Sequence, residues 1–229
     1  MTPLVSIFAS ANRPHYWLDL IASVREEEIP VEFVFCGPSD GNLKLPPNFK
    51  FIQSNEKPAT CVHLAYQQCQ ADYVLNVSDD WRFGPGAISQ VMSHTFYQRN
   101  PYTLFSMQYR VLGNIVAPEN YLLFTDCQPV PSHKHPMGMV GGVFKKETWD
   151  KLGGIDQRFE GLYVMEDMVL RYWAAGGGVS KIEDEAYLDE VDAVNTLHGK
   201  TGDWDLLKSL WVKDGIIQSQ RLQPVLSYP

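Results

Sequence analysis

Two adjacent carboxylates, Asp79 and Asp80, directly follow an apolar run at residues 73–77 that is typical of a buried strand. Carboxylate oxygens are the ligands that hard divalent cations prefer, and a cation held at a strand end could also bind a diphosphate. A solvent-exposed turn is the alternative, because Asp is common in turns. The pair therefore predicts either a metal and diphosphate site or a structural turn.

A second acidic pair, Glu166 and Asp167, opens an amphipathic helical face. Carboxylates in the first turn complement the helix dipole, and Asp167 stands four residues before Arg171, the spacing of a helical ion pair. The same helix end could also direct a carboxylate toward a ligand. His198, a residue type that binds metals and moves protons, precedes a further helix start. The residues alone leave structural and functional roles open for all of these groups.

The first acidic pair, Asp79 and Asp80, lies in a part of the sequence where strand and helix patterns alternate. Apolar runs predict strands at residues 4–9, 31–36, 49–52 and 73–77, and helical faces follow the first and third of these runs. A further helix is predicted at residues 88–96 and a further strand at 103–110. This order is typical of a parallel α/β sheet. Ligands bind beyond the carboxyl ends of such strands, so we expect the site at the loops that include residues 10–14, 37–41 and 78–82.

The regular alternation stops near residue 111, where prolines interrupt the chain. Short strands are predicted at residues 121–124 and 140–144, and acidic strand-like pieces at 180–190. Helices are predicted at residues 146–152, from 165 onward, and at 203–217. This second half is expected to build onto the same sheet rather than to fold as an independent domain.

The composition and net charge of the chain exclude some classes of function. Nineteen Lys and Arg against 27 Asp and Glu give a net charge of -8, which argues against nucleic acid as a partner. The four cysteines show no paired metal spacing, and reduced thiols fit a cytoplasmic location. No apolar stretch approaches the roughly 20 residues that span a bilayer, so no integral membrane segment is expected.

Taken in order, these motifs resemble the family-two glycosyltransferases of the GT-A fold. Residues 5–8 with Asn12, Arg13 and Pro14 resemble the first strand and nucleotide loop of that family. Residues 73–80 resemble the strand that delivers its Asp-x-Asp metal motif. The strongest similarity lies in three segments of the second half, which are residues 141–146, 152–159 and 166–171.

The resemblance implies an α/β fold, a GT-A three-layer α/β/α sandwich with a mostly parallel central sheet. It implies one domain over residues 1–229, with a nucleotide-binding half at 1–110 and an acceptor-binding half at 111–229. The implied activity is inverting transfer of a sugar from a nucleotide-diphospho-sugar to a glycan or small-molecule hydroxyl acceptor, in polysaccharide biosynthesis. The implied cofactor is a divalent cation, Mn²⁺ or Mg²⁺.

The resemblance also implies roles for individual residues. Asp167 would be the general base, with Glu166 beside it in the catalytic pair, and Asp80 and His198 would bind the metal. Gly141 and Gly142 would belong to the acceptor-binding segment. The nucleotide would be bound by Ala9, Ser10, Asn12, Arg13, Gly37 and Asp79. Where this sequence departs from the family at Ser78, Lys57 could supply compensating positive charge near the phosphates of the nucleotide.

Two alternatives stay open. Cys36 and Ser78 stand where the family usually carries Asp, which would suit a non-catalytic relative that binds a nucleotide or a glycan. A sugar-phosphate nucleotidyltransferase on the same kind of sheet is less favoured, because the loop at residues 10–14 contains none of the glycine that those enzymes carry after the first strand.

Overall fold

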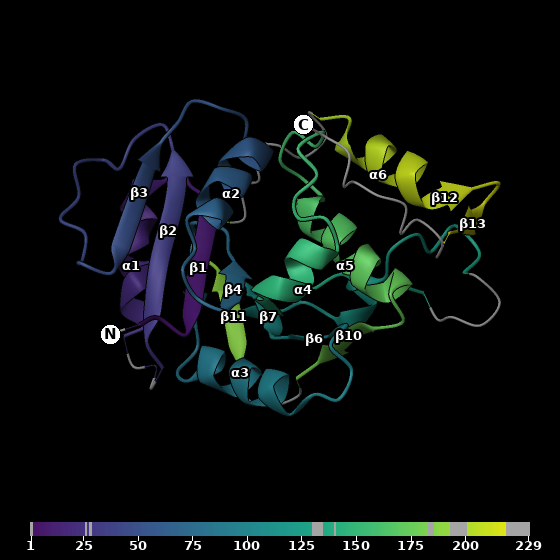
Figure 1. The fold of residues 1–229 in the computed structure, drawn as a ribbon, viewed down its shortest axis with the longest axis horizontal. Helices are drawn as coiled ribbons and strands as arrows, with labels where there is room; N and C mark the ends of the chain where they lie inside the picture. Colours follow the sequence, from purple (N-terminus) through teal and green to yellow (C-terminus); the bar gives the residue numbers. More distant parts are fainter. Residues whose placement is uncertain are drawn as a thin grey trace.

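The computed structural model describes residues 2–25, 27, 29–129, 135–139, 141–182, 186–192 and 201–218. A five-stranded sheet lies at its centre with the strand order β3-β2-β1-β4-β9 (Figure 1). Its parallel strands are β1 (Val5–Ser10), β2 (Val31–Gly37), β3 (Phe49–Gln53) and β4 (Tyr73–Asn76). The edge strand β9 (Val143–Lys145) is antiparallel to β4. The prediction of a mostly parallel central sheet is confirmed.

Helices cover both faces of this sheet, which makes three layers (Figure 1). One face packs against α1 (Pro14–Ser23) and α3 (Ala87–Tyr97). The other face packs against α2 (Pro58–Gln67), α4 (Lys146–Lys151) and α5 (Val164–Ala174). The last long helix, α6 (Asp203–Trp211), lies against α5 on the side away from the sheet, where the Trp211 indole N–H donates to Asp167 (Figure 1). Strands covered on both faces need apolar residues at successive positions, which explains the continuous apolar runs in the sequence.

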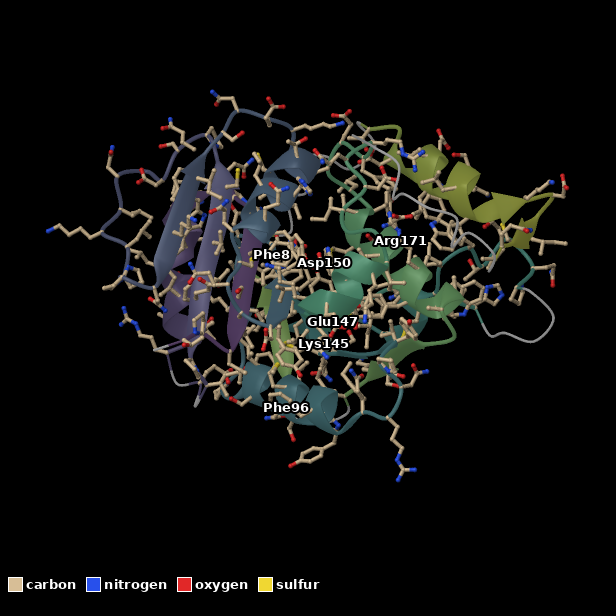
Figure 2. The ribbon with its side chains drawn as sticks, in the orientation of Figure 1. Phe8, Phe96, Lys145, Glu147, Asp150 and Arg171 are labelled. Carbon is tan, nitrogen blue, oxygen red and sulfur yellow. The ribbon has the colours of Figure 1, made fainter. Side chains whose placement is uncertain are left out.

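Side chains of β1 show how the sheet divides the core into two layers. Ile7 points to the face covered by α1 and α3, and its neighbour Phe8 points to the opposite face. Phe8, which is labelled in Figure 2, contacts two rings on this face. Its ring centroid lies 5.6 Å from that of Tyr66 on α2 and 5.8 Å from that of Trp149 on α4. The Tyr66 hydroxyl donates to Asp150. These contacts fix α2 and α4 on the same side of the sheet.

A smaller sheet brings distant residues next to the end of β4. Its order is β5-β11-β7-β8, formed by β5 (Trp81–Phe83), β11 (Tyr187–Glu190), β7 (Gln108–Val111) and β8 (Asn114–Ile115). A separate parallel pair joins β6 (Thr103–Ser106) to β10 (Gly178–Lys181). Glu190 on β11 lies opposite Trp81, and the Val191 N–H donates to the Asp80 carbonyl oxygen at 3.2 Å. Residues 190–192 therefore lie beside Asp80.

Three predicted elements differ from the structure. The strand expected at residues 103–110 is divided into β6 and β7, which belong to different sheets. Residues 121–124 form no strand; a 3-10 helix, η1 (Pro118–Tyr121), precedes a single bridge between Leu122 and Met137. The last helix ends at Trp211, where β12 (Val212–Lys213) and β13 (Ile216–Ile217) form a hairpin.

The hairpin turn explains the early end of α6. Asp214 and Gly215 have φ values of 53° and 75°. An Asp-Gly pair with two positive φ angles is the favoured two-residue turn between antiparallel strands. Across the described residues, no helix has the length and apolar content needed to cross a membrane.

Candidate functional site

Asp79 organises the loop that joins β1 to α1. Its Oδ2 accepts the backbone N–H groups of Asn12 and Arg13 at 2.8 and 2.7 Å and the indole N–H of Trp17 at 3.3 Å. Its Oδ1 accepts the Nε–H of Arg13 at 2.8 Å. The Asp79 side chain is 3% exposed. The structure therefore does not support Asp79 as a nucleotide contact, because its acceptor sites hold the loop in place.

Gly37 lets the same loop approach the end of β2. A Cβ at this position would lie 1.7 Å from the carbonyl oxygen of Ala11. The Ala11 N–H donates to the Cys36 carbonyl oxygen at 2.8 Å, which fixes this approach. Gly37 thus has a packing role at the edge where nucleotide binding is predicted. Ala9 and Ser10, which end β1, lie at the same edge.

Asp80 is buried and has both carboxylate oxygens engaged. Oδ1 accepts the Ser78 hydroxyl at 2.5 Å, and Oδ2 accepts Nη1–H of Arg13 at 2.8 Å. Burial raises the pKa of Asp80, while the bonds from Ser78 and Arg13 oppose that shift. Within the part of the chain that the structure describes, no three His, Cys, Asp or Glu side chains are arranged to hold a metal ion. Because Arg13 and Ser78 engage both oxygens of Asp80, this arrangement does not fit the predicted role of Asp80 as a metal ligand.

Arg13 links the two carboxylates that follow β4. Its Nη2 lies 2.7 Å from Asp79 Oδ1 and 3.1 Å from the Ser78 hydroxyl, and its Nη1 lies 3.8 Å from Asp192. Burial lowers the pKa of Arg13, but Asp79 and Asp80 outweigh that effect and raise it. The guanidinium is therefore a fixed positive charge among carboxylates.

Two further acidic residues reach this site from β11 and the residues after it. Burial raises the pKa of Glu190 to about 7, and the charge of Asp80 adds to the shift. The Tyr109 hydroxyl donates to Glu190, and the Tyr16 hydroxyl donates to Asp192 at 3.3 Å. These two carboxylates are not among the site residues predicted from the sequence, because their only signal is an acidic strand pattern about a hundred residues beyond Asp80.

Asp167 faces the core of the second half. Its Oδ1 accepts the Trp211 indole N–H at 2.7 Å, and its Oδ2 forms an ion pair with Arg171. Arg171 also donates to the carbonyl oxygens of Leu152 and Gly154 at 3.0 and 2.8 Å. Asp167 is 1% exposed. This ion pair closes the carboxylate off from an acceptor hydroxyl, so the structure does not support Asp167 as the general base.

Glu166, the neighbour of Asp167, has a different environment. Its side chain is partly exposed, and it forms no ion pair with any residue in the described ranges. Burial raises the pKa of Glu166. Tyr163, one turn earlier, adopts a left-handed φ of 59° where α5 begins. Burial raises the pKa of Tyr163, and the charge of the nearby Glu166 adds to the shift. Glu166 is therefore the carboxylate of the pair that could accept a proton.

Asp203 holds the loop that leads into α5. Its carboxylate accepts the backbone N–H groups of Glu160, Gly161 and Leu162 at 2.8, 3.0 and 2.8 Å. The Glu160 carbonyl oxygen accepts the Ala59 N–H of α2 at 3.1 Å. The loop that precedes Glu166 is thus fixed to α6 and to the start of α2.

The remaining predicted residues lie in three places. Lys57 immediately precedes α2, and its ammonium is 3.4 Å from Glu160. A Cβ on Gly141 would lie 2.2 Å from Leu188, and one on Gly142 would lie 2.0 Å from Met139. These glycines therefore have a packing role, and an acceptor contact stays a prediction. His198, predicted to bind metal, lies outside the described residues.

The chain matches no family model and no curated protein. Its fold nevertheless matches solved structures. TarS 1-349 from S. aureus has a TM-score of 0.63 and 13% identity, over 82% of this chain and 60% of that one. The same TarS segment in complex with UDP-GlcNAc has a TM-score of 0.62 and 14% identity, over 83% and 59%.

A third structure extends the match over more of this chain. The mannosyltransferase PcManGT from Pyrobaculum calidifontis, in complex with GDP-Man and Mn²⁺, has a TM-score of 0.61 and 12% identity, over 92% of this chain and 62% of that one. This chain therefore spans 59% to 62% of the length of these three neighbours. The chain has the GT-A-type fold that its sequence motifs predict, and it shares that fold with proteins that bind nucleotide sugars.

Proposed function

We propose that this chain is a glycosyltransferase that takes its sugar from a nucleotide-diphospho-sugar. The observation that carries the proposal is the fold shared over 82% to 92% of the chain with TarS and PcManGT, which were solved with UDP-GlcNAc and GDP-Man. The order of sequence motifs supports the same class independently of the fold comparison. A fold alone does not determine an activity, so the proposal is built on specific residues.

The donor site is proposed at the carboxyl ends of β1, β2 and β4, where open α/β sheets bind ligands. Asp79 and Gly37 position the β1–α1 loop there, as described above. The side chain of Asn12 in that loop and Lys57, which precedes α2, are the proposed nucleotide contacts, whereas the guanidinium of Arg13 is held by Asp79 and Asp80. In this proposal residues 1–110 bind the donor and residues 111–229 bind a glycan or small-molecule acceptor.

Glu166 is the proposed general base in place of Asp167. The acceptor oxygen attacks the anomeric carbon, the bond from that carbon to the diphosphate oxygen breaks, and the nucleoside diphosphate leaves with the electron pair. The acceptor proton passes to the Glu166 carboxylate. One displacement of this kind inverts the anomeric configuration, and a base of raised pKa is well suited to accept the proton.

The predicted divalent cation is not used in this mechanism, because Arg13 and Ser78 already hold both oxygens of Asp80. A role in polysaccharide biosynthesis and a cytoplasmic location belong to the proposal as well. One second candidate has a specific observation in its favour. Because Asp80 and Asp167 both lie in ion pairs, the chain would also suit a non-catalytic protein that binds a nucleotide or a glycan.

Substitution of the two neighbouring carboxylates tests the proposal. Glu166→Gln should lower transfer from UDP-GlcNAc or GDP-mannose by about 10²- to 10⁴-fold, because it removes the proton acceptor. Its unfolding midpoint and its affinity for UDP or GDP should stay close to those of the wild type. Asp167→Asn should instead lower the unfolding midpoint, because it weakens the buried ion pair with Arg171.

Transfer is measured as release of nucleoside diphosphate with a panel of glycan acceptors. Glu147→Gln, at an exposed position on α4, is the matched control and should leave transfer unchanged. Full turnover by Glu166→Gln would exclude Glu166 as the base. Nucleotide binding by the wild type without transfer to any acceptor would favour the non-catalytic candidate.

A further inference from the structure

We infer that the guanidinium of Arg13, and not a divalent metal ion, is the cation bound to Asp79 and Asp80, and that nucleotide binding by this chain needs no metal. The part of this inference that concerns nucleotide binding rests on the proposed function and deepens that function. It contrasts with PcManGT, whose complex with GDP-Man also contains Mn²⁺.

The hydrogen-bond donors of the Arg13 side chain bind the carboxylates of both Asp79 and Asp80. Its Nε–H binds Asp79 Oδ1 at 2.8 Å, and its Nη1 binds Asp80 Oδ2 at 2.8 Å. Its Nη2 lies 2.7 Å from Asp79 and 3.1 Å from the Ser78 hydroxyl. A planar guanidinium can bridge two carboxylates in this way, whereas a compact ammonium cannot. Arg13 therefore binds both acidic residues of the motif at once.

The backbone holds Arg13 in this position. Asp79 Oδ2 accepts the N–H of Arg13 itself at 2.7 Å and that of Asn12 at 2.8 Å. The side chain and the main chain of Arg13 are thus fixed by the same carboxylate. Pro14, the next residue, begins α1 and restricts the backbone further. Movement of the guanidinium away from Asp80 would have to break bonds that position the whole β1–α1 loop.

A metal ion at Asp80 would compete directly with Arg13. Mg²⁺ and similar ions bind carboxylate oxygens at about 2.0 to 2.6 Å, closer than the guanidinium nitrogen already bound there. The two positive charges would then lie within a few ångströms of each other in a buried setting, where their repulsion is poorly screened. The other oxygen of Asp80 is held by Ser78 at 2.5 Å. Binding of a metal would therefore require displacement of both partners.

Manganese binding tests the inference without any nucleotide. Electron paramagnetic resonance of Mn²⁺ added to the full chain would be compared for the wild type and Asp80→Asn. We expect the two proteins to bind the same small amount of Mn²⁺. Arg13→Gln, which removes the competing charge, should gain bound Mn²⁺. Wild-type Mn²⁺ binding that Asp80→Asn abolishes would overturn the inference.

Nucleotide titrations give the second readout. Calorimetry with UDP and GDP in excess EDTA and in Mn²⁺ should give wild-type dissociation constants within about threefold of each other. The inference would be refuted if the affinity of the wild type for the nucleotide fell about tenfold or more in EDTA and Mn²⁺ had no effect on the affinity of Asp80→Asn. The proposed function would stay intact in that case. No nucleotide binding in either condition would refute the proposed function and the claim of metal-free nucleotide binding, while the Mn²⁺ measurement would still decide the role of Arg13. If Arg13→Gln fails to fold by circular dichroism, the comparison of wild type with Asp80→Asn decides it.

Discussion

Carboxylates that look alike in the sequence differ in the structure because their partners differ. Asp79 and Asp167 accept hydrogen bonds from fixed donors and stabilise the loop and the core around them. Asp80 is neutralised by Arg13. Glu166 is partly desolvated without a cation among the described residues, which makes it more basic. The chemical role of each carboxylate thus depends on which donors surround it rather than on its position in a motif.

Glu190 gives a prediction about pH at the residue scale. Burial raises its pKa from 4.5 to about 7, so between these values the native state keeps a proton that the unfolded chain has lost. The free energy of unfolding contributed by this group should therefore fall as pH rises from about 4.5 to about 7 and then stay constant.

Glu190→Gln should remove this dependence while leaving an acceptor for Tyr109. Urea unfolding at about pH 5 and about pH 8 should show the variant gaining stability over the wild type by on the order of 1 kcal/mol at the higher pH, a figure discounted for partial exposure. An equal difference between the two proteins at both pH values would contradict the prediction.

At the scale of single elements, two loops position the residues of the proposed site. The β1–α1 loop is held by Asp79, and the loop before α5 is held by Asp203. In both cases a carboxylate from a distant part of the chain accepts several backbone N–H groups. Such bonds satisfy donors that an irregular segment cannot satisfy by itself.

Asp203→Ala should destabilise the protein by about 1 to 3 kcal/mol, because the N–H groups of residues 160–162 lose their acceptors. Asp205→Ala on the same helix is the control, since Asp205 is exposed, and it should change stability by less than about 0.5 kcal/mol. Denaturant unfolding measures both variants. Equal losses in the two variants would show that the effect comes from the charge of α6 and not from the loop.

At the scale of the whole molecule, the central sheet separates two buried clusters and leaves the carboxyl ends of its strands for the site. One cluster joins the sheet to α1 and α3, and the other joins it to the remaining long helices. The proposed donor contacts lie in the loops that follow two strands of this sheet, β1 and β3. Ligand binding at that edge would therefore stabilise the folded molecule as a unit.

UDP or GDP should raise the midpoint of thermal unfolding, because a ligand that binds only the native state stabilises it. Differential scanning fluorimetry with each nucleotide, and with inorganic diphosphate as the control, measures the shift. Formation of inorganic diphosphate from a nucleoside triphosphate and a sugar 1-phosphate would instead indicate a nucleotidyltransferase.

The sequence by itself determined the regular part of the fold. Apolar runs with interleaved helical faces predicted β1 to β4 and the helices between them, because strands buried on both faces must be apolar throughout. The order of motifs also predicted the GT-A-type fold. Spacing even suggested the Arg171 ion pair of Asp167, because residues four apart meet on one face of a helix.

Only the tertiary structure decided which acidic residues are engaged and which could react. Arg13 reaches Asp79 and Asp80 across more than sixty intervening residues, and Trp211 reaches Asp167 across more than forty. Glu190 joins the first group through strand pairing with β5. Local patterns carry no information about such contacts, because they arise from the packing of distant segments, and that packing sets the charge and accessibility of each carboxylate.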